Sequence, residues 1–401
     1  MRKILIGAAV AAVALSTFAI PVGAKRNPAP LKGEGKNMKI VANVPYTGGT
    51  DMELTTIKGR DYAFAGSWAS VKDGGGVHVI DITKPEKPKE VAWLKCSVSQ
   101  GDIQISHNNK YVFQAHDGTG GPEACLGVGK VGFNIIDVRN PAKPKVVGHA
   151  DTNGSHNTTA HPTKPYVYNS SSALAGEPFI QIWSVKNPKK PELVNTFDSL
   201  PHAPHDISFN KDGTMAVTAA ISHFDIFDTS DPENPVLLYT GQCPGCSITH
   251  DAKFLPDDSG IVVGDEGGGG GGYPCPGGAL YFYSLQGGRV PVLQGVYEPG
   301  EFGVARDGQT GVDGCTSHVF DFDESGKHIA ISWYSAGTRY LDISAYTGLT
   351  VGDQGTPGGV VEAGWFMPDG GKSWSSKFHK GPYIFSNDMN RGFDVFKVSG
   401  K

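Results

Sequence analysis

The stretch LPHAPHDISF, residues 200–209, contains the phrase around which this chain is organised. From His205 onward it predicts a short strand, because apolar and polar residues alternate between a proline-rich turn and the turn NKDG. The same phrase returns at 250–254 (HDAKF), at 318–322 (HVFDF) and more loosely at 156–160 (HNTTA), each time followed by a turn. Four predicted strands therefore begin with a histidine at the same register, namely His156, His205, His250 and His318.

A second phrase recurs along the chain and gives the period of the fold. It is an apolar run that ends in a polar residue, followed in the clearest copies by two prolines, as in VHVIDITKPEKP at 77–88 and FNIIDVRNPAKP at 133–144. The polar residues of seven such runs lie at positions 81, 137, 184, 228, 284, 342 and 397, so successive copies are 56, 47, 44, 56, 58 and 55 residues apart. This spacing is typical of the blades of a β-propeller.

Each copy is expected to form four strands, of which the innermost begins with the histidine phrase. The seventh copy lacks an outer strand, and residues 38–44 (MKIVANV) can supply it and close the ring. The sequence therefore predicts an all-β fold, a seven-bladed β-propeller that forms one domain over residues 38–401, after a polar tail at 25–37. We assign the aspartates that precede the proline pairs to turn capping and not to chemistry; they are Asp81, Asp137, Asp228 and Asp342.

The first 24 residues indicate export. A basic start, an apolar run at 4–20 and the small residues Val-Gly-Ala at 22–24 are typical of a secretory signal peptide cleaved after Ala24, with an uncleaved anchor helix as the alternative. Without the two basic residues of this segment, 33 basic and 40 acidic side chains give a net charge of −7, which argues against a nucleic-acid or anionic-membrane binder. We expect a secreted or extracytoplasmic monomer, with no membrane span after signal removal, that binds a small molecule or a protein at its loop-rich face.

The repeats resemble the LVIVD repeat of secreted and surface bacterial β-propeller proteins, and the residues at 80–88 and 135–148 carry the resemblance. It covers the chain after the signal, more strongly in the first four copies than in the last three. The resemblance implies a propeller fold, and it implies little about activity because such folds host unrelated functions.

The histidines at one register predict a metal site. The innermost strand of a blade lines the central channel, and seven such positions would hold about a quarter of one histidine by chance, given 13 histidines in 401 residues. Position 373 or 374 is expected at this register in the seventh blade. Neutral imidazoles on rigid strands suit a divalent transition metal such as Fe, Cu or Zn. We therefore expect His156, His205, His250 and His318 to be its ligands.

A second group of side chains is expected to orient these imidazoles from behind, that is, from the side facing away from the metal. The pairs His116-Asp117 and Asp265-Glu266 fall at equivalent points of two blades, and the expected group is Asp206, Asp251, His202, Asp265, Glu266 and His116. In geometry alone, the arrangement is similar to the four-histidine iron site of carotenoid-cleaving propeller oxygenases and to metal-binding propellers of the selenium-binding type. A metal-dependent oxidase or oxygenase is one interpretation. A water-filled channel lined by His–Asp pairs, a non-metal polar ligand, and a non-enzymatic binding or scaffold propeller at the cell surface are the alternatives.

Six cysteines in an exported chain predict three disulfides. We expect Cys96 to pair with Cys125 within the second blade. Two pairings stay open for the other four, either Cys246–Cys275 with Cys243–Cys315 or Cys243–Cys275 with Cys246–Cys315. The spacing of Cys243 and Cys246 would also suit a redox or zinc pair.

Overall fold

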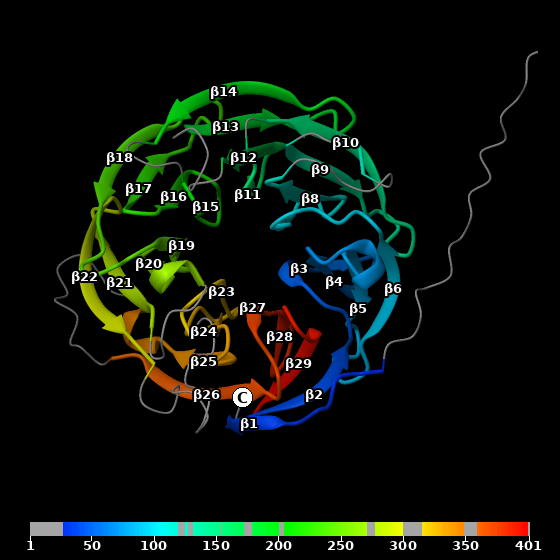
Figure 1. Ribbon diagram of the computed structural model, residues 1–401. Helices are drawn as coiled ribbons and strands as arrows, with labels where there is room; N and C mark the ends of the chain where they lie inside the picture. Colours follow the sequence, from blue (N-terminus) through cyan, green and yellow to red (C-terminus); the bar gives the residue numbers. More distant parts are fainter. Residues whose placement is uncertain are drawn as a thin grey trace, which may run out of the picture.

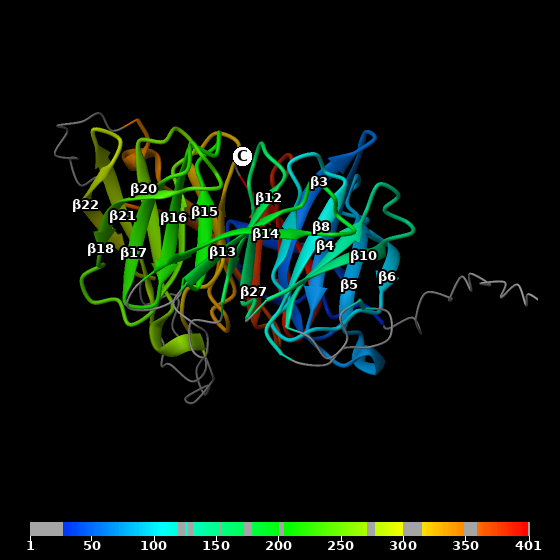
Figure 2. The same cartoon turned by 90° about the horizontal axis from the view of Figure 1, so that it is seen from above.

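Seven antiparallel sheets are arranged in a ring in the computed structural model of the protein (Figure 1). Seen from the side, their strands run between the two faces of the ring (Figure 2). The predicted all-β, seven-bladed β-propeller is confirmed. The structure describes residues 27–118, 125–126, 131–152, 154–171, 179–199, 204–270, 277–299, 315–348 and 359–399, so the predicted signal peptide lies outside the described residues.

Each blade has its first strand at the channel and its last strand at the rim. From the channel outward, the strands are β3 (Gly49–Ile57), β4 (Arg60–Ser67), β5 (Gly76–Asp81) and β6 (Lys89–Leu94) in blade one; β7 (Ile103–Ile105), β8 (Tyr111–His116), β9 (Gly132–Asp137) and β10 (Lys145–Asp151) in blade two; β11 (Asn157–Ala160), β12 (Tyr166–Ser170), β13 (Phe179–Ser184) and β14 (Glu192–Asp198) in blade three; β15 (Asp206–Phe209), β16 (Met215–Ala220), β17 (His223–Asp228) and β18 (Val236–Gly241) in blade four; β19 (Thr249–Phe254), β20 (Gly260–Asp265), β21 (Ala279–Gln286) and β22 (Val290–Tyr297) in blade five; β23 (Phe320–Phe322), β24 (His328–Ser332), β25 (Thr338–Asp342) and β26 (Val361–Pro368) in blade six; and β27 (Ser373–Phe378), β28 (Tyr383–Asp388) and β29 (Gly392–Val398) in blade seven.

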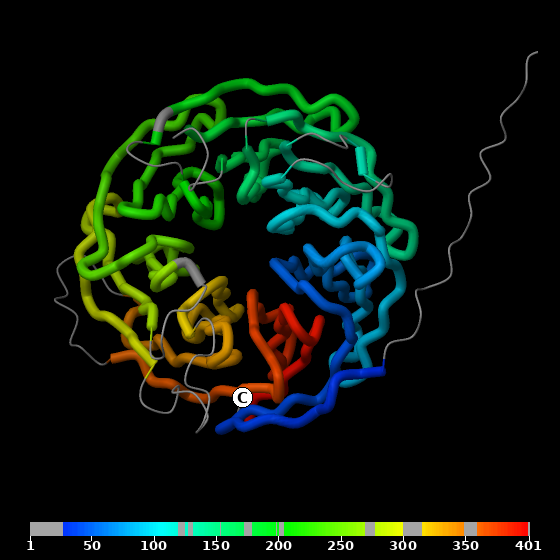
Figure 3. Tube along the Cα trace, in the orientation of Figure 1, coloured from blue at the N-terminus to red at the C-terminus, as the bar shows by residue number. Residues whose placement is uncertain are grey.

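The N-terminal segment closes the ring. Strand β2 (Met38–Val44) pairs antiparallel with β29, with Met38 opposite Val398, and so supplies the outer strand of blade seven as predicted. Figure 3 shows this segment, in blue, beside the red C-terminal blade. The residues before it, which we had expected in a polar tail, include a further strand, β1 (Gly33–Lys36), which pairs with β26 and gives blade six a fifth strand. The outer edges of two blades are thereby tied together.

The predicted turn aspartates have the structural role assigned to them. In each case the carboxylate accepts a hydrogen bond from the backbone N–H two residues later, which fixes the turn between the third and fourth strands. The donors are Thr83 for Asp81, Arg139 for Asp137, Ser230 for Asp228 and Ser344 for Asp342.

The hydrophobic core lies between adjacent blades. One cluster joins Phe282 of blade five to Phe320 and Leu341 of blade six, all of them buried. Another joins Phe64 of blade one to Val112 of blade two. Because each blade buries both faces against its neighbours, burial of apolar surface, worth roughly 25 cal/mol per Å², stabilises the ring as a whole.

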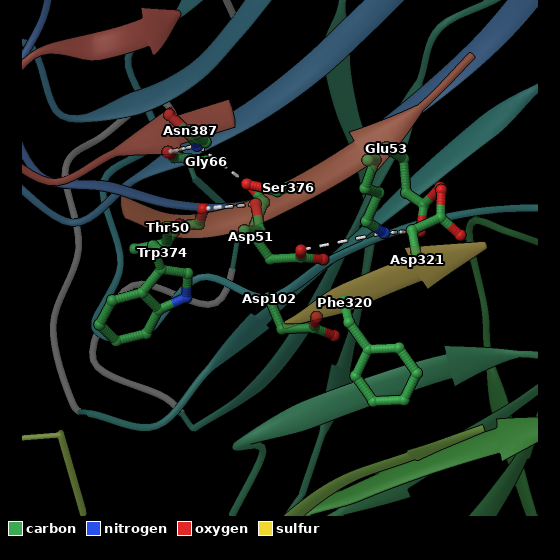
Figure 4. A network of polar contacts seen from close by, with 12 residues as sticks. Thr50, Asp51, Glu53, Gly66, Asp102, Phe320, Asp321, Trp374, Ser376 and Asn387 are labelled. Atoms are coloured by element: carbon green, nitrogen blue, oxygen red, sulfur yellow. Dashed lines mark hydrogen bonds and ion pairs between the residues drawn. The ribbon is translucent and has the colours of Figure 1, made fainter. Parts of the chain in front are cut away.

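Polar contacts tie the innermost strands to one another. The carboxylate of Asp102 in blade two accepts a hydrogen bond of 2.8 Å from the backbone N–H of Thr158 in blade three. Asp251 accepts one of 3.3 Å from Phe320, and Asp321 one of 3.2 Å from Phe378, so blades five and six and blades six and seven are joined in the same way. Asp102 and Asp321 lie with other carboxylates where these strands meet (Figure 4). The aspartates satisfy N–H groups that the open edge of an inner strand would leave unpaired.

Candidate metal centre

The four histidines of the repeated register lie together in the channel. His250 belongs to β19, and the others stand just before the innermost strands of their blades. All four side chains are buried. Their imidazole centroids follow one another at 4.1, 4.0 and 4.2 Å in the order His156, His205, His250 and His318. The imidazoles therefore form one continuous row across four consecutive blades.

The two ends of the row are held by oxygen acceptors. His156 Nδ1 lies 2.8 Å from Asp117 Oδ2, and His318 Nδ1 lies 2.7 Å from the carbonyl oxygen of Trp374. Both acceptors require a proton on Nδ1, so in the neutral imidazoles the lone pair is on Nε2. His156 Nε2 faces His205 Nε2 at 2.7 Å. The hydrogen bonds thus turn Nε2 of His156 toward His205 and leave Nε2 of His318 near Glu266, at 3.8 Å.

Glu266, which follows β20, lies in front of the imidazoles and not behind them as we expected. Its carboxylate oxygens are 3.6 Å from His250 Nε2 and 3.8 Å from His318 Nε2. The hydroxyl of Tyr334 donates a hydrogen bond of 2.6 Å to Glu266 Oε1. Within the described part of the chain, His205, His250 and Glu266 form the one group of three whose possible ligand atoms all lie within 4.8 Å of each other. This group can hold a metal ion.

Burial favours the neutral form of three imidazoles in the row, those of His205, His250 and His318. It lowers the pKa of His205 and of His250 well below the usual value, with the neighbouring imidazoles as the next cause. Burial also lowers the pKa of His318 to about 3. Burial raises the pKa of Glu266 to about 7, although the hydrogen bond from Tyr334 acts in the opposite direction and lowers it. Neutral imidazole is the form that binds metal, and a bound cation would favour the ionised form of Glu266.

The predicted roles of Asp206 and Asp251 are wrong, because successive residues of a strand face opposite sides. Asp251 forms an ion pair with Lys253 and accepts the N–H of Phe320 in the next blade. Asp206 Oδ1 accepts the N–H of Ile207, and burial followed by the charge of Asp251 raises the pKa of Asp206 to about 7. Asp251 therefore joins two blades, whereas Asp206 bonds to the backbone of its own strand.

The two equivalent pairs each place their second residue at the imidazoles. Asp117 contacts His156, whereas His116 is buried at the end of β8 and does not line the channel cavity. Asp265 accepts backbone hydrogen bonds from Ser247 and Ile248 and so holds the loop before β19. Asp265 therefore holds a loop backbone and not an imidazole, the expected place of His116 behind the imidazoles stays a prediction, and His202 lies outside the described residues.

Two aromatic residues lie beside the row and were not predicted as site residues from the sequence. Trp374, at a position expected for this register in blade seven, packs on His318 with centroids 4.3 Å apart, and Tyr334 lies 4.9 Å from the same imidazole. Trp374 could have been found from its register. Tyr334 follows the end of β24, and no pattern in the sequence marks it. The imidazoles, Glu266 and both aromatic residues line one channel cavity of about 620 Å³.

The cysteines confirm one predicted disulfide and correct the others. Cys96 and Cys125 are bonded, with 5.2 Å between their Cα atoms. Cys243 is bonded to Cys246, with 5.5 Å between Cα atoms, so both predicted alternatives for these two residues are wrong. Cys315 is also disulfide-bonded, and Cys275 lies outside the described residues. Among the described cysteines none is a free thiol, which leaves no dithiol ligand pair at Cys243 and Cys246.

Helices contribute little to the described chain, and among its residues none forms a helix with the length and apolar character of a membrane span.

The chain matches no protein-family model and no curated protein sequence. Among solved structures, it is similar to hydrazine synthase of Kuenenia stuttgartiensis, with a TM-score of 0.62 and 12% identity over 89% of this chain and 97% of the other. It is also similar to the β-propeller domain of Cps50 (Swd1) of Myceliophteria thermophila, with a TM-score of 0.61 and 10% identity over 90% and 100% of the chains. A functionally unknown protein of Desulfotomaculum acetoxidans DSM 771 gives a TM-score of 0.54 and 14% identity over 78% and 88%. At such identities the likeness shows the propeller fold alone.

Proposed function

We propose that this β-propeller binds a divalent transition metal ion through the imidazoles in its channel. The observation that supports this proposal is a pair of hydrogen bonds, from Nδ1 of His156 to Asp117 and from Nδ1 of His318 to the Trp374 carbonyl. Histidines that bind metals commonly donate their other N–H to a carboxylate or a backbone carbonyl, which fixes the tautomer and the orientation. The two ends of the row have this arrangement.

The ligands would come from His156, His205, His250, His318 and Glu266. For His205 and His250, either ring nitrogen is available, because the buried Nδ1 atoms have no hydrogen-bond partner among the described residues. Imidazoles with one carboxylate suit Fe, Cu and Zn, and two histidines with one carboxylate are typical of catalytic iron and zinc sites with open positions. When bound, such an ion supplies Lewis-acid or redox chemistry. The protein's own groups hold the ligands in place and keep a cavity open beside them.

We further propose that the protein is exported and that the metal acts on a small molecule in the cavity. The disulfides Cys96–Cys125 and Cys243–Cys246 support an oxidising compartment, and the predicted signal peptide would direct the chain there. A cavity of about 620 Å³ has the volume of a small-molecule site.

Metal analysis of protein purified from the oxidising compartment without an affinity tag tests the proposal. We expect about one ion of Fe, Cu or Zn per chain after repletion, and almost none in the variant His250→Ala. His379→Ala is the matched control, because His379 pairs with Asp61 away from the channel row. A folded wild-type protein that binds no metal after repletion would leave the water-filled channel as the explanation of the row.

A further inference from the structure

Aromatic side chains adjoin the metal centre on one side of the cavity. Trp68, which follows β4, meets Trp374 at a centroid distance of 4.9 Å and an angle of 72°, so the two rings form a corner. Trp374 packs on His318, and Tyr334 lies against both Trp374 and His318. Trp68 is 36% exposed although it is a large apolar side chain. We call Trp68, Tyr334 and Trp374 the aromatic corner.

The backbone around the cavity is strained where large side chains point into it. Gln100, Ile221 and Tyr334 have positive φ values of 62°, 59° and 41°, and all three line the cavity. A β-branched or aromatic residue in this region costs on the order of 1–3 kcal/mol, and such residues cluster at ligand sites. Isolated bridges hold two of them in place, Ile221 to Thr249 and Tyr334 to Ser373.

The other described non-glycine residues with positive φ lie in turns between strands; they are Asn37, Lys58, Asn109 and Asp258. The strain at the cavity therefore has a different origin. Strain of this kind is typical of ligand sites.

One cation lies beside the aromatic corner. Lys372 lines the cavity, and its Nζ is 5.5 Å from the centroid of the Tyr334 ring. Within the described residues, no carboxylate forms an ion pair with this ammonium group. Glu266 accepts the Tyr334 hydroxyl and faces His250 and His318, and Asp388 accepts the backbone N–H of Lys372. The part of the cavity beside Lys372 and the partly exposed Trp68, its outer part, therefore holds an ammonium group that is ion-paired with no described carboxylate.

An aromatic cage without a lysine would suit an organic cation. Here the ammonium group of Lys372 already lies over Tyr334 and would repel a second cation. We propose that the outer part of the cavity binds a small planar aromatic acid, a carboxylate or a phenolate, whose ring packs in the aromatic corner and whose anionic group approaches Lys372. This inference rests on the proposed function, because the bound molecule would lie next to the metal and would be its substrate.

Calorimetry with three probes tests the inference on metal-repleted and on chelator-treated protein. The probes are 2-naphthoate, the saturated acid cyclohexanecarboxylate, and the aromatic cation 2-naphthylmethylamine. We expect 2-naphthoate to bind about tenfold or more tightly than the saturated acid, because only the aromatic acid gains ring contacts in addition to burial. The amine should show no measurable binding.

Two variants locate the site. Lys372→Met should weaken 2-naphthoate binding about tenfold, as expected for loss of a hydrogen bond to a charged group, and should leave metal content unchanged. Trp68→Leu should weaken it about 3–10-fold. Lys211→Met, an exposed lysine in the turn before β16, is the matched control and should bind normally.

The outcomes separate the two proposals. If the repleted protein holds no metal but still binds 2-naphthoate with this selectivity, the metal proposal fails and the aromatic-acid site stands. If the protein holds metal but does not bind 2-naphthoate, binds it no better than the saturated acid, or binds the amine as tightly, the aromatic-acid site is overturned. A normal affinity in Lys372→Met overturns it as well.

Discussion

His156 Nε2 and His205 Nε2 lie 2.7 Å apart, although the two residues come from different blades. The Nδ1–H group of His156 donates a hydrogen bond to Asp117, so Nε2, which faces His205, is the nitrogen with the lone pair in the neutral form of this imidazole. Two ring nitrogens in this arrangement are joined either by one proton or by a shared metal ion. The contact between Asp117 and His156 therefore decides how well His156 can bind a metal.

Replacing Asp117 by alanine should weaken metal binding while leaving the fold intact. Loss of a carboxylate behind a ligating histidine typically lowers metal affinity by about 10–100-fold. Asp117 follows the end of β8 and lies outside the strands, so thermal unfolding of the metal-free variant should match that of the metal-free wild type. Competition with a chromophoric chelator measures the affinity.

Glu324→Ala, which removes an exposed carboxylate from the turn before β24, is the control for the change in net charge and should bind metal as the wild type does. An unchanged affinity in Asp117→Ala would mean that His156 is not a ligand.

The stability of the protein should depend on pH through His161, which is buried between blades. Its Nδ1 accepts hydrogen bonds from the backbone N–H groups of Thr163 and Lys164, and burial followed by the charge of Lys164 lowers its pKa from 6.5 to about 4. The unfolded chain therefore binds more protons than the folded one between these values. Stability from the neutral imidazole is fully present above pH 6.5 and is lost as the pH falls toward 4.

The variant His161→Asn isolates this contribution, because an asparagine oxygen can accept the same N–H groups and does not titrate. Urea unfolding of both proteins, each in metal-free form, at pH 7 and pH 4.5 should show a smaller loss of stability for the variant than for the wild type. An equal loss in the two proteins would assign the acid sensitivity to other groups.

The fold was predictable because its signals are local and repeated. The spacing of residues such as Asp81 and Asp137 gives the blade count, and the histidine register gives the row in the channel. The directions in which neighbouring side chains face were harder to predict. The histidines and the aspartates that follow them were expected at one centre, but alternation along each strand sends the aspartates, such as Asp251, to the contacts between blades.

The other wrong or missed predictions concern residues in loops. Whether Cys243 pairs with Cys246 or with a more distant cysteine depends on the path of the loop, and sequence spacing does not fix that path. Tyr334 reaches Glu266 only because the backbone adopts a positive φ of 41° after β24, which the sequence does not mark with a glycine or an asparagine. Tertiary contacts hold this conformation, so it is absent from any local pattern.

Removing Asp251 should destabilise the propeller. Its carboxylate forms an ion pair with the largely buried ammonium group of Lys253 and accepts the N–H of Phe320 in the next blade. Asp251→Asn would leave Lys253 with Asp206 as its remaining nearby carboxylate. We expect a loss of up to about 3 kcal/mol in the free energy of unfolding, because a buried charge without its partner is costly.

The double variant Asp251→Asn/Lys253→Met should recover part of that loss, since it also removes the buried charge. Chemical denaturation of the wild type, both single variants and the double variant gives the coupling between the two residues. Additive effects of the two substitutions would show that the pair does not act as a unit.

The two described disulfides should differ in how much they stabilise the fold. They close loops of unequal length, since Cys96 and Cys125 are 29 residues apart and Cys243 and Cys246 are 3 apart. A cross-link restricts the unfolded chain more when the loop is longer. Loop-closure entropy predicts that the free energy of unfolding falls by about 3–4 kcal/mol in Cys96→Ala/Cys125→Ala and by about 1.5–2 kcal/mol in Cys243→Ala/Cys246→Ala.

Each pair is replaced by alanine so that the two variants are matched in chemistry, and urea unfolding under oxidising conditions compares them. Equal losses, or a larger loss for the short loop, would show that the bonds act mainly through contacts in the folded state.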